Sequence, residues 1–161
     1  MSKVRLPGPE PDSPGVVVFP PLLFGSALLL GFILQRIRPV HPLPDAAAYG
    51  LGGVVLLGSL VLALWAERVM HAAGTNVRPD QPTLAIVTGG PFRYTRNPLY
   101  IASTGLVVGL GLLFNALWPL VLVLPVLVVV RYGVVAREER YLEKKFGETY
   151  LAYKGRVRRW F

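Results

Sequence analysis

Four apolar runs with short connections between them restrict the possible folds of this chain more than any other feature. The runs lie at about residues 16–35, 49–66, 98–114 and 117–135, and only Asn115 and Ala116 separate the last two. A transmembrane α-helix needs about 20 apolar residues, and three of the runs approach that length. The third run is shorter, so it either tilts little or ends below the far interface. The sequence therefore predicts an all-α polytopic membrane protein with about four transmembrane helices.

The overall composition agrees with this class and limits the number of domains. Apolar residues make up 53% of the 161 residues and charged residues only 16%, whereas about 25% of residues are charged in soluble domains. A chain of this length has room for one compact domain and none for a separate soluble catalytic domain. We expect an extended, proline-rich arm over residues 1–15 and a single membrane domain over residues 16–161. That domain is expected to end in a helical tail over residues 136–161.

The charges are unevenly distributed along the chain. The net charge is +8, from 17 Lys and Arg against 9 Asp and Glu. All of the cations except Arg36 and Arg38 lie before the first run, between the second and third runs, or from Arg131 onward. Lys and Arg are enriched in cytoplasmic segments of membrane proteins, so both termini and the helical tail are predicted to be cytoplasmic. The cations favour anionic lipid headgroups or an anionic ligand as partners, and no motif indicates nucleic acid.

Two residue types that often build functional sites are rare in this chain. It has no cysteine, which excludes a disulfide framework, a thiolate metal site and a cysteine nucleophile. Its two histidines, His41 and His71, are too few for a histidine-built zinc site, and no metal is expected. Glu67 lies four residues before His71 at the end of the second run, so the pair is a candidate for a catalytic base. The alternative is an ordinary contact on a helix surface.

The segment GGPFRYTRNPLYIAST, residues 89–104, leads directly into the third apolar run. Asn is a favoured N-cap residue and Pro is favoured at the first helical position, so Asn97 and Pro98 are predicted to begin the third helix. A cap does not account for the neighbouring Arg93, Arg96 and Tyr100. These side chains are predicted either to anchor the helix at the membrane interface or to bind a ligand there.

The segment REERYLEKKFGETYLAYKGRVRRWF, residues 137–161, follows the fourth run. A helix is predicted to continue to Phe146 and to end at Gly147. Glu138 and Glu139 would stand about one turn beyond the bilayer, where two adjacent carboxylates call for an opposing cation. The candidates for that cation are Arg93, Arg96 and Arg156.

Tyr150, Tyr153 and Arg156 are spaced three residues apart and share one face if this segment is helical. Such a row suits an aromatic, polar ligand. It equally suits an aromatic and basic anchor on the membrane surface.

Taken in order, these segments resemble the group of integral membrane enzymes that contains the isoprenylcysteine carboxyl methyltransferases and the phospholipid methyltransferases. The resemblance covers roughly residues 70–160. It depends on the order and spacing of the motifs together, because no single motif is specific. The matching pieces are Ala73–Thr75, Pro79, Val87–Tyr100, Glu138–Glu139, Leu142, Phe146–Gly147, Tyr150, Tyr153 and Arg156–Val157.

The resemblance implies transfer of a methyl group from S-adenosylmethionine to a lipophilic acceptor at the cytoplasmic face of the membrane. By position, it implies that the cofactor is bound by Gly74, Arg96, Asn97, Pro98, Tyr100, Glu138, Glu139, Tyr150, Tyr153 and Arg156. It assigns no catalytic residue, and the candidates are Glu67, His71 and Arg156.

The chain departs from the group's pattern at two positions. Carboxyl methyltransferases usually have His where this chain has Asn97, whereas NPLY resembles the form found in phospholipid methyltransferases. Arg158 stands where Pro is common. The nature of the acceptor therefore stays open, from a prenylated cysteine or phospholipid amine to a sterol-like or quinone-like molecule. Two other classes stay open as well: an NADPH-dependent membrane reductase related to sterol reductases, and a non-catalytic lipid-binding membrane protein.

Overall fold

The computed structural model of the protein describes residues 14–78 and 81–160, and within them the chain is all-helical. The helices are α1 (Pro20–Ile37), α2 (Asp45–Ala72), α3 (Pro98–Leu113), α4 (Leu117–Val129), α5 (Ala136–Phe146) and α6 (Glu148–Arg156), with a 3₁₀ turn η1 (Gly90–Arg93) and a π-helical segment η2 (Val130–Val135). Most of the arm expected over residues 1–15 lies outside the described residues, as do Pro79 and the last residue of the tail.

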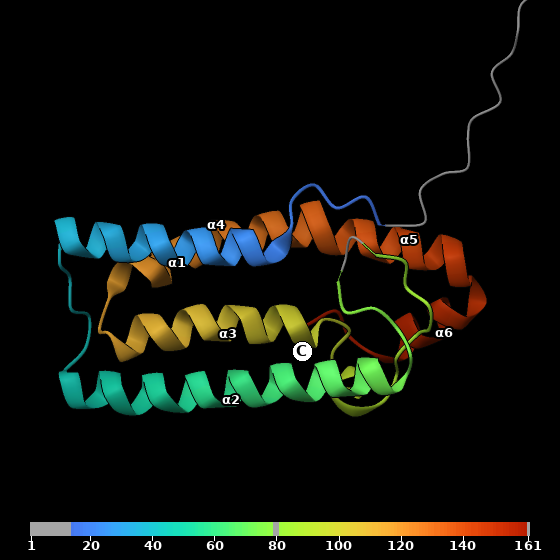
Figure 1. Ribbon diagram of the computed structural model, residues 1–161, viewed down its shortest axis with the longest axis horizontal. Coiled ribbons are helices and arrows are strands. Elements are labelled where there is room, and N and C mark those ends of the chain that lie inside the picture. Colours follow the sequence, from blue (N-terminus) through green and yellow to red (C-terminus); the bar gives the residue numbers. More distant parts are fainter. Residues whose placement is uncertain (1–13, 79–80, 161) are drawn as a thin grey trace, which may run out of the picture.

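The four apolar helices lie side by side with their long axes roughly aligned (Figure 1). Helix α3 lies in the middle and packs against α2 and α4, while α1 packs mainly against α4. The polar part of the chain gathers at one end of this bundle, where α5 and α6 and the connection from α2 to α3 lie together (Figure 1). The prediction of an all-α polytopic membrane protein is confirmed.

Three of the helices are long and apolar enough to cross a membrane: α1, α2 and the continuous helix Leu117–Phe146, which contains α4, η2 and α5. This last helix has 30 residues, or about 45 Å at about 1.5 Å per residue. A hydrocarbon core is about 30 Å thick, so its polar end, α5, extends beyond the apolar segment 117–135.

Helix α3 has only 16 residues, but the turn after it meets the connection between α1 and α2. Asn115 donates hydrogen bonds from Nδ2 to the carbonyl of Leu43 at 2.7 Å and to Asp45 Oδ1 at 2.9 Å. Its φ of 47° lies in the left-handed region, which Asn tolerates better than most residues. These hydrogen bonds join the turn after α3 to the connection between α1 and α2. They hold the far end of the short helix α3 in place.

Glycines let α2 and α3 approach closely. A Cβ atom on Gly109 would lie 2.7 Å from the backbone nitrogen of Leu56, and one on Gly105 would overlap the Ser59 hydroxyl. Small residues at such positions allow the backbones of membrane helices to pack directly. This contact fixes the start of α3 relative to the end of α2, where the candidate site lies.

The π-helical segment η2 joins α4 to α5 and was not predicted from the sequence. Val130, Val134 and Val135 of this segment are fully buried, and Val130 packs in the core with Phe24 and Val107. A π turn contains an extra residue compared with an α turn, so it changes the direction in which the following side chains point. The segment thereby sets the direction of the two carboxylates at the start of α5.

Candidate functional site

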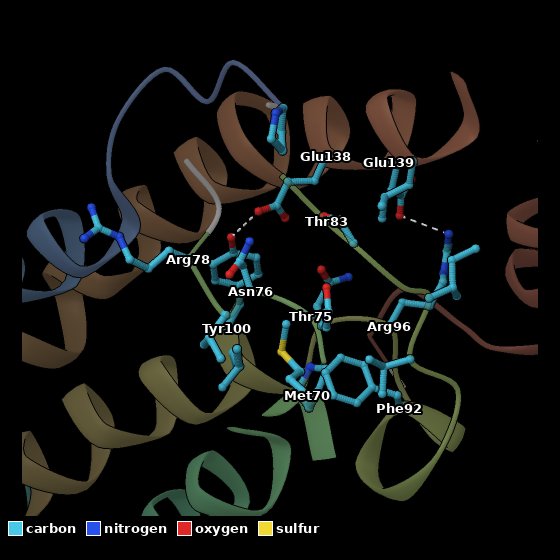
Figure 2. Close-up of a pocket in the computed structure, with 18 of the residues that line it drawn as sticks. Met70, Thr75, Asn76, Arg78, Thr83, Phe92, Arg96, Tyr100, Glu138 and Glu139 are labelled. Atoms are coloured by element: carbon cyan, nitrogen blue, oxygen red, sulfur yellow. Dashed lines mark hydrogen bonds and ion pairs between the residues drawn. The ribbon is translucent and has the colours of Figure 1, made fainter. Parts of the chain in front are cut away.

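A cavity of about 320 Å³ lies at the polar end of the bundle. Its walls come from the start of α1, the end of α2, residues 75–78 and 83–87 of the connection after α2, η1, the start of α3, and helices α5 and α6. Figure 2 shows Glu138 and Glu139 on one wall, with Tyr100 of α3 and Arg96, two residues before α3, facing them. Segments far apart in the sequence thus form one polar site.

Most of the residues implied by the resemblance line this cavity: Arg96, Asn97, Pro98, Tyr100, Glu138, Glu139, Tyr150 and Tyr153. Gly74 and Arg156 do not line it. Among the catalytic candidates, Glu67 lies on its wall, whereas His71 is exposed and lies outside it. The structure therefore does not bring Glu67 and His71 together in the cavity as a catalytic pair.

Glu139 is a buried carboxylate held by two arginines. Arg96 Nη1 lies 3.1 Å from Glu139 Oε1. Arg159 binds the same carboxylate in a bidentate manner, with Nε 2.9 Å from Oε1 and Nη2 2.7 Å from Oε2. Such pairs are stronger than neutral hydrogen bonds and fix the carboxylate in one orientation.

These contacts correct the predicted set of opposing cations. Arg96 belongs to that set, but Arg93 and Arg156 are exposed, and Arg159 takes their place. The sequence offered three nearby arginines in RVRRW and no basis for choosing Arg159 among them. In the structure, Trp160 packs against the core next to Arg159.

The backbone that follows α6 runs along the start of α3. Arg96 N donates to the carbonyl of Arg158 at 3.0 Å, and Asn97 Nδ2 donates to the carbonyl of Arg159 at 2.9 Å. We call residues 157–160 the C-terminal strap. The strap is attached both to the start of α3 by these bonds and to α5 through Glu139.

Asn97 differs from its prediction as a capping residue. It occupies the N-cap position of α3 and Pro98 follows at the first helical position, as expected, but the Asn97 side chain makes no capping hydrogen bond. Its amide binds the C-terminal strap instead.

Glu138 differs from its neighbour because its partner is a hydroxyl group. Tyr100 donates a hydrogen bond to Glu138 Oε1 at 2.7 Å. Burial raises the pKa of Glu138 from 4.5 to about 7; the hydrogen bond from Tyr100 lowers the pKa, while the nearby charge of Glu139 raises it. Burial thus favours the protonated form of Glu138, whereas Glu139 lies between two guanidinium groups.

The guanidinium of Arg96 has one hydrogen-bond donor that its contact with Glu139 does not use. Its Nε atom is buried and has no hydrogen-bond partner among the described residues. A buried donor without a partner costs free energy. A ligand that places an acceptor atom near Nε would recover that cost.

Tyr150 and Tyr153 form an aromatic wall rather than a surface anchor. Both are buried, and their ring centroids lie 6.2 Å apart in an edge-to-face arrangement. Tyr153 donates to the carbonyl of Phe92 at 2.8 Å. Burial raises the pKa of both phenols, so they remain neutral at physiological pH.

The connection after α2 supplies wall residues that the sequence did not indicate. Thr75 is buried and its hydroxyl accepts a hydrogen bond from Leu84 N at 3.0 Å, while Asn76 Nδ2 donates to the carbonyl of Pro82 at 2.8 Å. These bonds hold the connection in place around the cavity. The wall residues that were missed include Phe19, Met70, Thr75, Asn76, Arg78 and Thr83.

A bundle of apolar helices with a cavity that holds charged and aromatic side chains at one end is the architecture of an integral membrane protein. Comparison with known proteins gives its family. The model of the phospholipid methyltransferase family matches residues 47–149, which include α2 to α5 and the start of α6, and the chain belongs to this family of membrane methyltransferases.

Two further comparisons add less. An uncharacterized protein from Haemophilus influenzae is 65% identical to this chain over 26 residues, which are 16% of this chain and 41% of that protein. The matched stretch is thus less than half of that relative. No solved structure matches the chain.

Proposed function

We propose that the protein transfers a methyl group from S-adenosylmethionine to a lipophilic acceptor at the cytoplasmic face of the membrane. The observation that carries the proposal is the family match over residues 47–149, because the same residues build most of the cavity. We take residues 16–161 as one membrane domain, since the cavity draws on helices from α1 to α6.

The polar wall suits the cofactor. Glu138 offers an acceptor for the amine or the ribose hydroxyls of S-adenosylmethionine, and Arg96 Nε offers a donor for its carboxylate. The rings of Tyr150 and Tyr153 offer an aromatic surface beside the same wall. Each type of group in the cofactor thereby has a matching partner.

The arrangement of charge suits methyl transfer from a sulfonium ion. The positive charge of the sulfonium disperses in the transition state, so an uncompensated anion next to the sulfur would stabilise the ground state more than the transition state. Glu139 is compensated by Arg96 and Arg159, and burial raises the pKa of Glu138, which favours its neutral form. The in-line displacement then depends mainly on holding the acceptor and the methyl group at about 3 Å in a dry site.

The remaining wall suits a lipophilic acceptor. Phe19, Pro20, Met70 and Leu99 line the cavity on the side of the apolar helices. An acceptor whose chain lies in the bilayer would reach the cavity there without leaving the membrane. The cations of α5, α6 and the connections at this end support a cytoplasmic orientation.

Calorimetric titration of the protein in a maltoside detergent tests the proposal. We expect heat of binding with S-adenosylmethionine and none with NADPH, and we expect Glu138→Gln to weaken binding relative to the matched surface variant Glu148→Gln. Binding of NADPH instead of S-adenosylmethionine would identify a reductase. Binding of neither would leave a lipid-binding protein and overturn the proposal.

A further inference from the structure

The segment before α1, residues 14–19, forms part of the cavity wall. Pro14 and Phe19 of this segment line the cavity, together with Pro20 and Pro21 at the start of α1. Figure 1 shows the segment running from the start of α1 toward α5. The family match begins at residue 47, so this wall lies outside the part of the chain that matches the family.

Two hydrogen bonds attach the segment to the long helix that contains η2 and α5. Arg137 Nη1 donates to the carbonyl of Gly15 at 3.1 Å, and Val17 N donates to the carbonyl of Gly133 at 3.4 Å. Gly15 has a φ of 58°, in the left-handed region that glycine adopts without strain. The chain can therefore turn at Gly15 and place its carbonyl beside Arg137.

Phe19 joins the same segment to the connection after α2. The guanidinium carbon of Arg78 lies 5.4 Å from the centroid of the Phe19 ring. Figure 2 shows Arg78 on the opposite side of the cavity from Arg96 and Glu139. Residues 14–19 thus contact η2 and α5 on one side and the connection after α2 on the other.

These contacts are of kinds that break and form again readily. Gly15 and Val17 are exposed, and Arg78 and Arg137 are exposed as well. Cation–π contacts and hydrogen bonds are weak where water competes for them. A segment held mainly by exposed contacts opens at a lower free energy than the helices around it.

We propose that residues 14–19 form a lid over the cavity. The lid opens when Phe19 leaves Arg78 and residues 15–17 leave the long helix, and it closes over a bound ligand. Closure excludes water from the cavity, which favours methyl transfer under the proposed function. The proposal concerns access to the cavity and does not depend on which ligand binds there.

Thiol labelling measures the opening of this lid, because the chain has no cysteine of its own. Ser103→Cys places a reporter thiol on the cavity wall in α3, and Thr149→Cys places a reference thiol on the exposed surface of α6. The protein in maltoside micelles, without cofactor or acceptor, is treated with iodoacetamide. Mass spectrometry of peptides gives the rate of labelling at each thiol.

We expect Arg137→Gln to raise the labelling rate of the reporter by about threefold to tenfold and to leave the reference rate unchanged. Arg137 does not line the cavity, so a faster rate reports movement of the lid rather than a hole in the wall. Phe19→Ala should raise the rate by at least as much. Two matched controls should leave it unchanged: Arg140→Gln, at an exposed arginine of α5 outside the cavity, and Phe32→Ala, toward the other end of α1.

A disulfide tests whether the lid must move for the reporter to react. A Cβ atom on Gly133 would lie 3.9 Å from the Cβ atom of Val17, which suits a disulfide. In a chain that carries Val17→Cys and Gly133→Cys, oxidation should slow labelling of the reporter below its rate in the wild-type background. Reduction should restore the rate.

An unchanged rate in Arg137→Gln, or an equal rise in Arg140→Gln, would overturn the proposal. So would an oxidised disulfide that leaves labelling as fast as before. Failure of the disulfide to form would contradict the closed position of the lid. These measurements use no cofactor, so a failure of S-adenosylmethionine to bind would contradict the proposed function alone.

Discussion

Glu138 and Glu139 are adjacent in the sequence but have different surroundings, and the difference separates binding from stability. Glu139 joins Arg96 of the segment before α3, Arg159 of the C-terminal strap and its own helix α5. Glu138 has Tyr100 as its partner and lines the cavity. The resemblance implied the same role for both carboxylates, whereas we propose that Glu138 contacts the cofactor and that Glu139 positions Arg96 and the C-terminal strap.

Glutamine at each position separates the two roles. Glu138→Gln should lower the affinity for S-adenosylmethionine by about tenfold or more, with little loss of stability. Glu139→Gln should lower the unfolding temperature, because it leaves two guanidinium groups without their counter-ion. Breaking a buried ion pair costs about 3–5 kcal/mol, and we expect the lower end because the Arg159 side chain is 31% exposed. Calorimetry and thermal unfolding measure the two effects, and equal behaviour of both variants would contradict the assignment.

The raised pKa of Glu138 predicts a pH dependence of stability. The pKa is 4.5 in the unfolded chain and about 7 in the folded protein. The folded state therefore holds a proton that the unfolded state releases, so stability should fall as the pH rises from about 4.5 to 7 and then level off. Thermal unfolding of the wild type and of Glu138→Gln across this range measures the effect. The variant should lack this part of the pH dependence, and identical profiles would contradict the origin assigned to it.

At the scale of elements, the C-terminal strap connects α5 to the segment before α3. It binds the start of α3 through two carbonyl groups and binds Glu139 through Arg159. Trp160 packs against the same core as Tyr100 and Val130. The strap is therefore placed to hold Asn97 and Glu139 in position relative to each other.

Replacement of Arg159 tests the role of the strap. Arg159→Ala should weaken S-adenosylmethionine binding and make the strap more susceptible to protease, and Arg159→Lys should restore part of the binding. Arg156→Ala is the matched control, since Arg156 is exposed and its Nε atom donates to the carbonyl of Ala152 in its own helix turn. A larger loss of affinity in the Arg156 variant would favour the role implied by the resemblance over the one assigned here.

The sequence predicted elements better than it predicted contacts between them. Apolar runs and the signals at Pro98 and Gly147 are local, and the helices begin or end at these residues as expected. Arg159 could not be chosen over Arg156, because the choice depends on how the strap turns after α6. The π-helical segment left no recognisable pattern in a run of valines. The walls from Thr75 to Thr83 depend on hydrogen bonds within a connection, which no periodicity reveals.

At the scale of the whole molecule, the proposed orientation places the cavity on the cytoplasmic side. The chain has no cysteine, so single cysteines report position without background. Phe114→Cys, at an exposed site at the far end of α3, should react with an impermeant thiol reagent from outside the cell. Thr149→Cys, exposed on α6 at the cavity end, should react only after the membrane is opened. The reverse labelling pattern would show that the cavity faces the outside of the cell and would contradict the proposed orientation.

The central claim is that this cavity transfers a methyl group to a lipid, and isotope transfer tests it most directly. The protein is reconstituted in vesicles of a bacterial lipid extract with S-adenosylmethionine that carries a deuterated methyl group, and the lipids are analysed by mass spectrometry. The account predicts a lipid that gains the labelled methyl group with the wild type and far less of it with Glu138→Gln. Absence of labelled lipid with a wild-type protein that binds S-adenosylmethionine, or equal labelling with Glu138→Gln, would contradict the account.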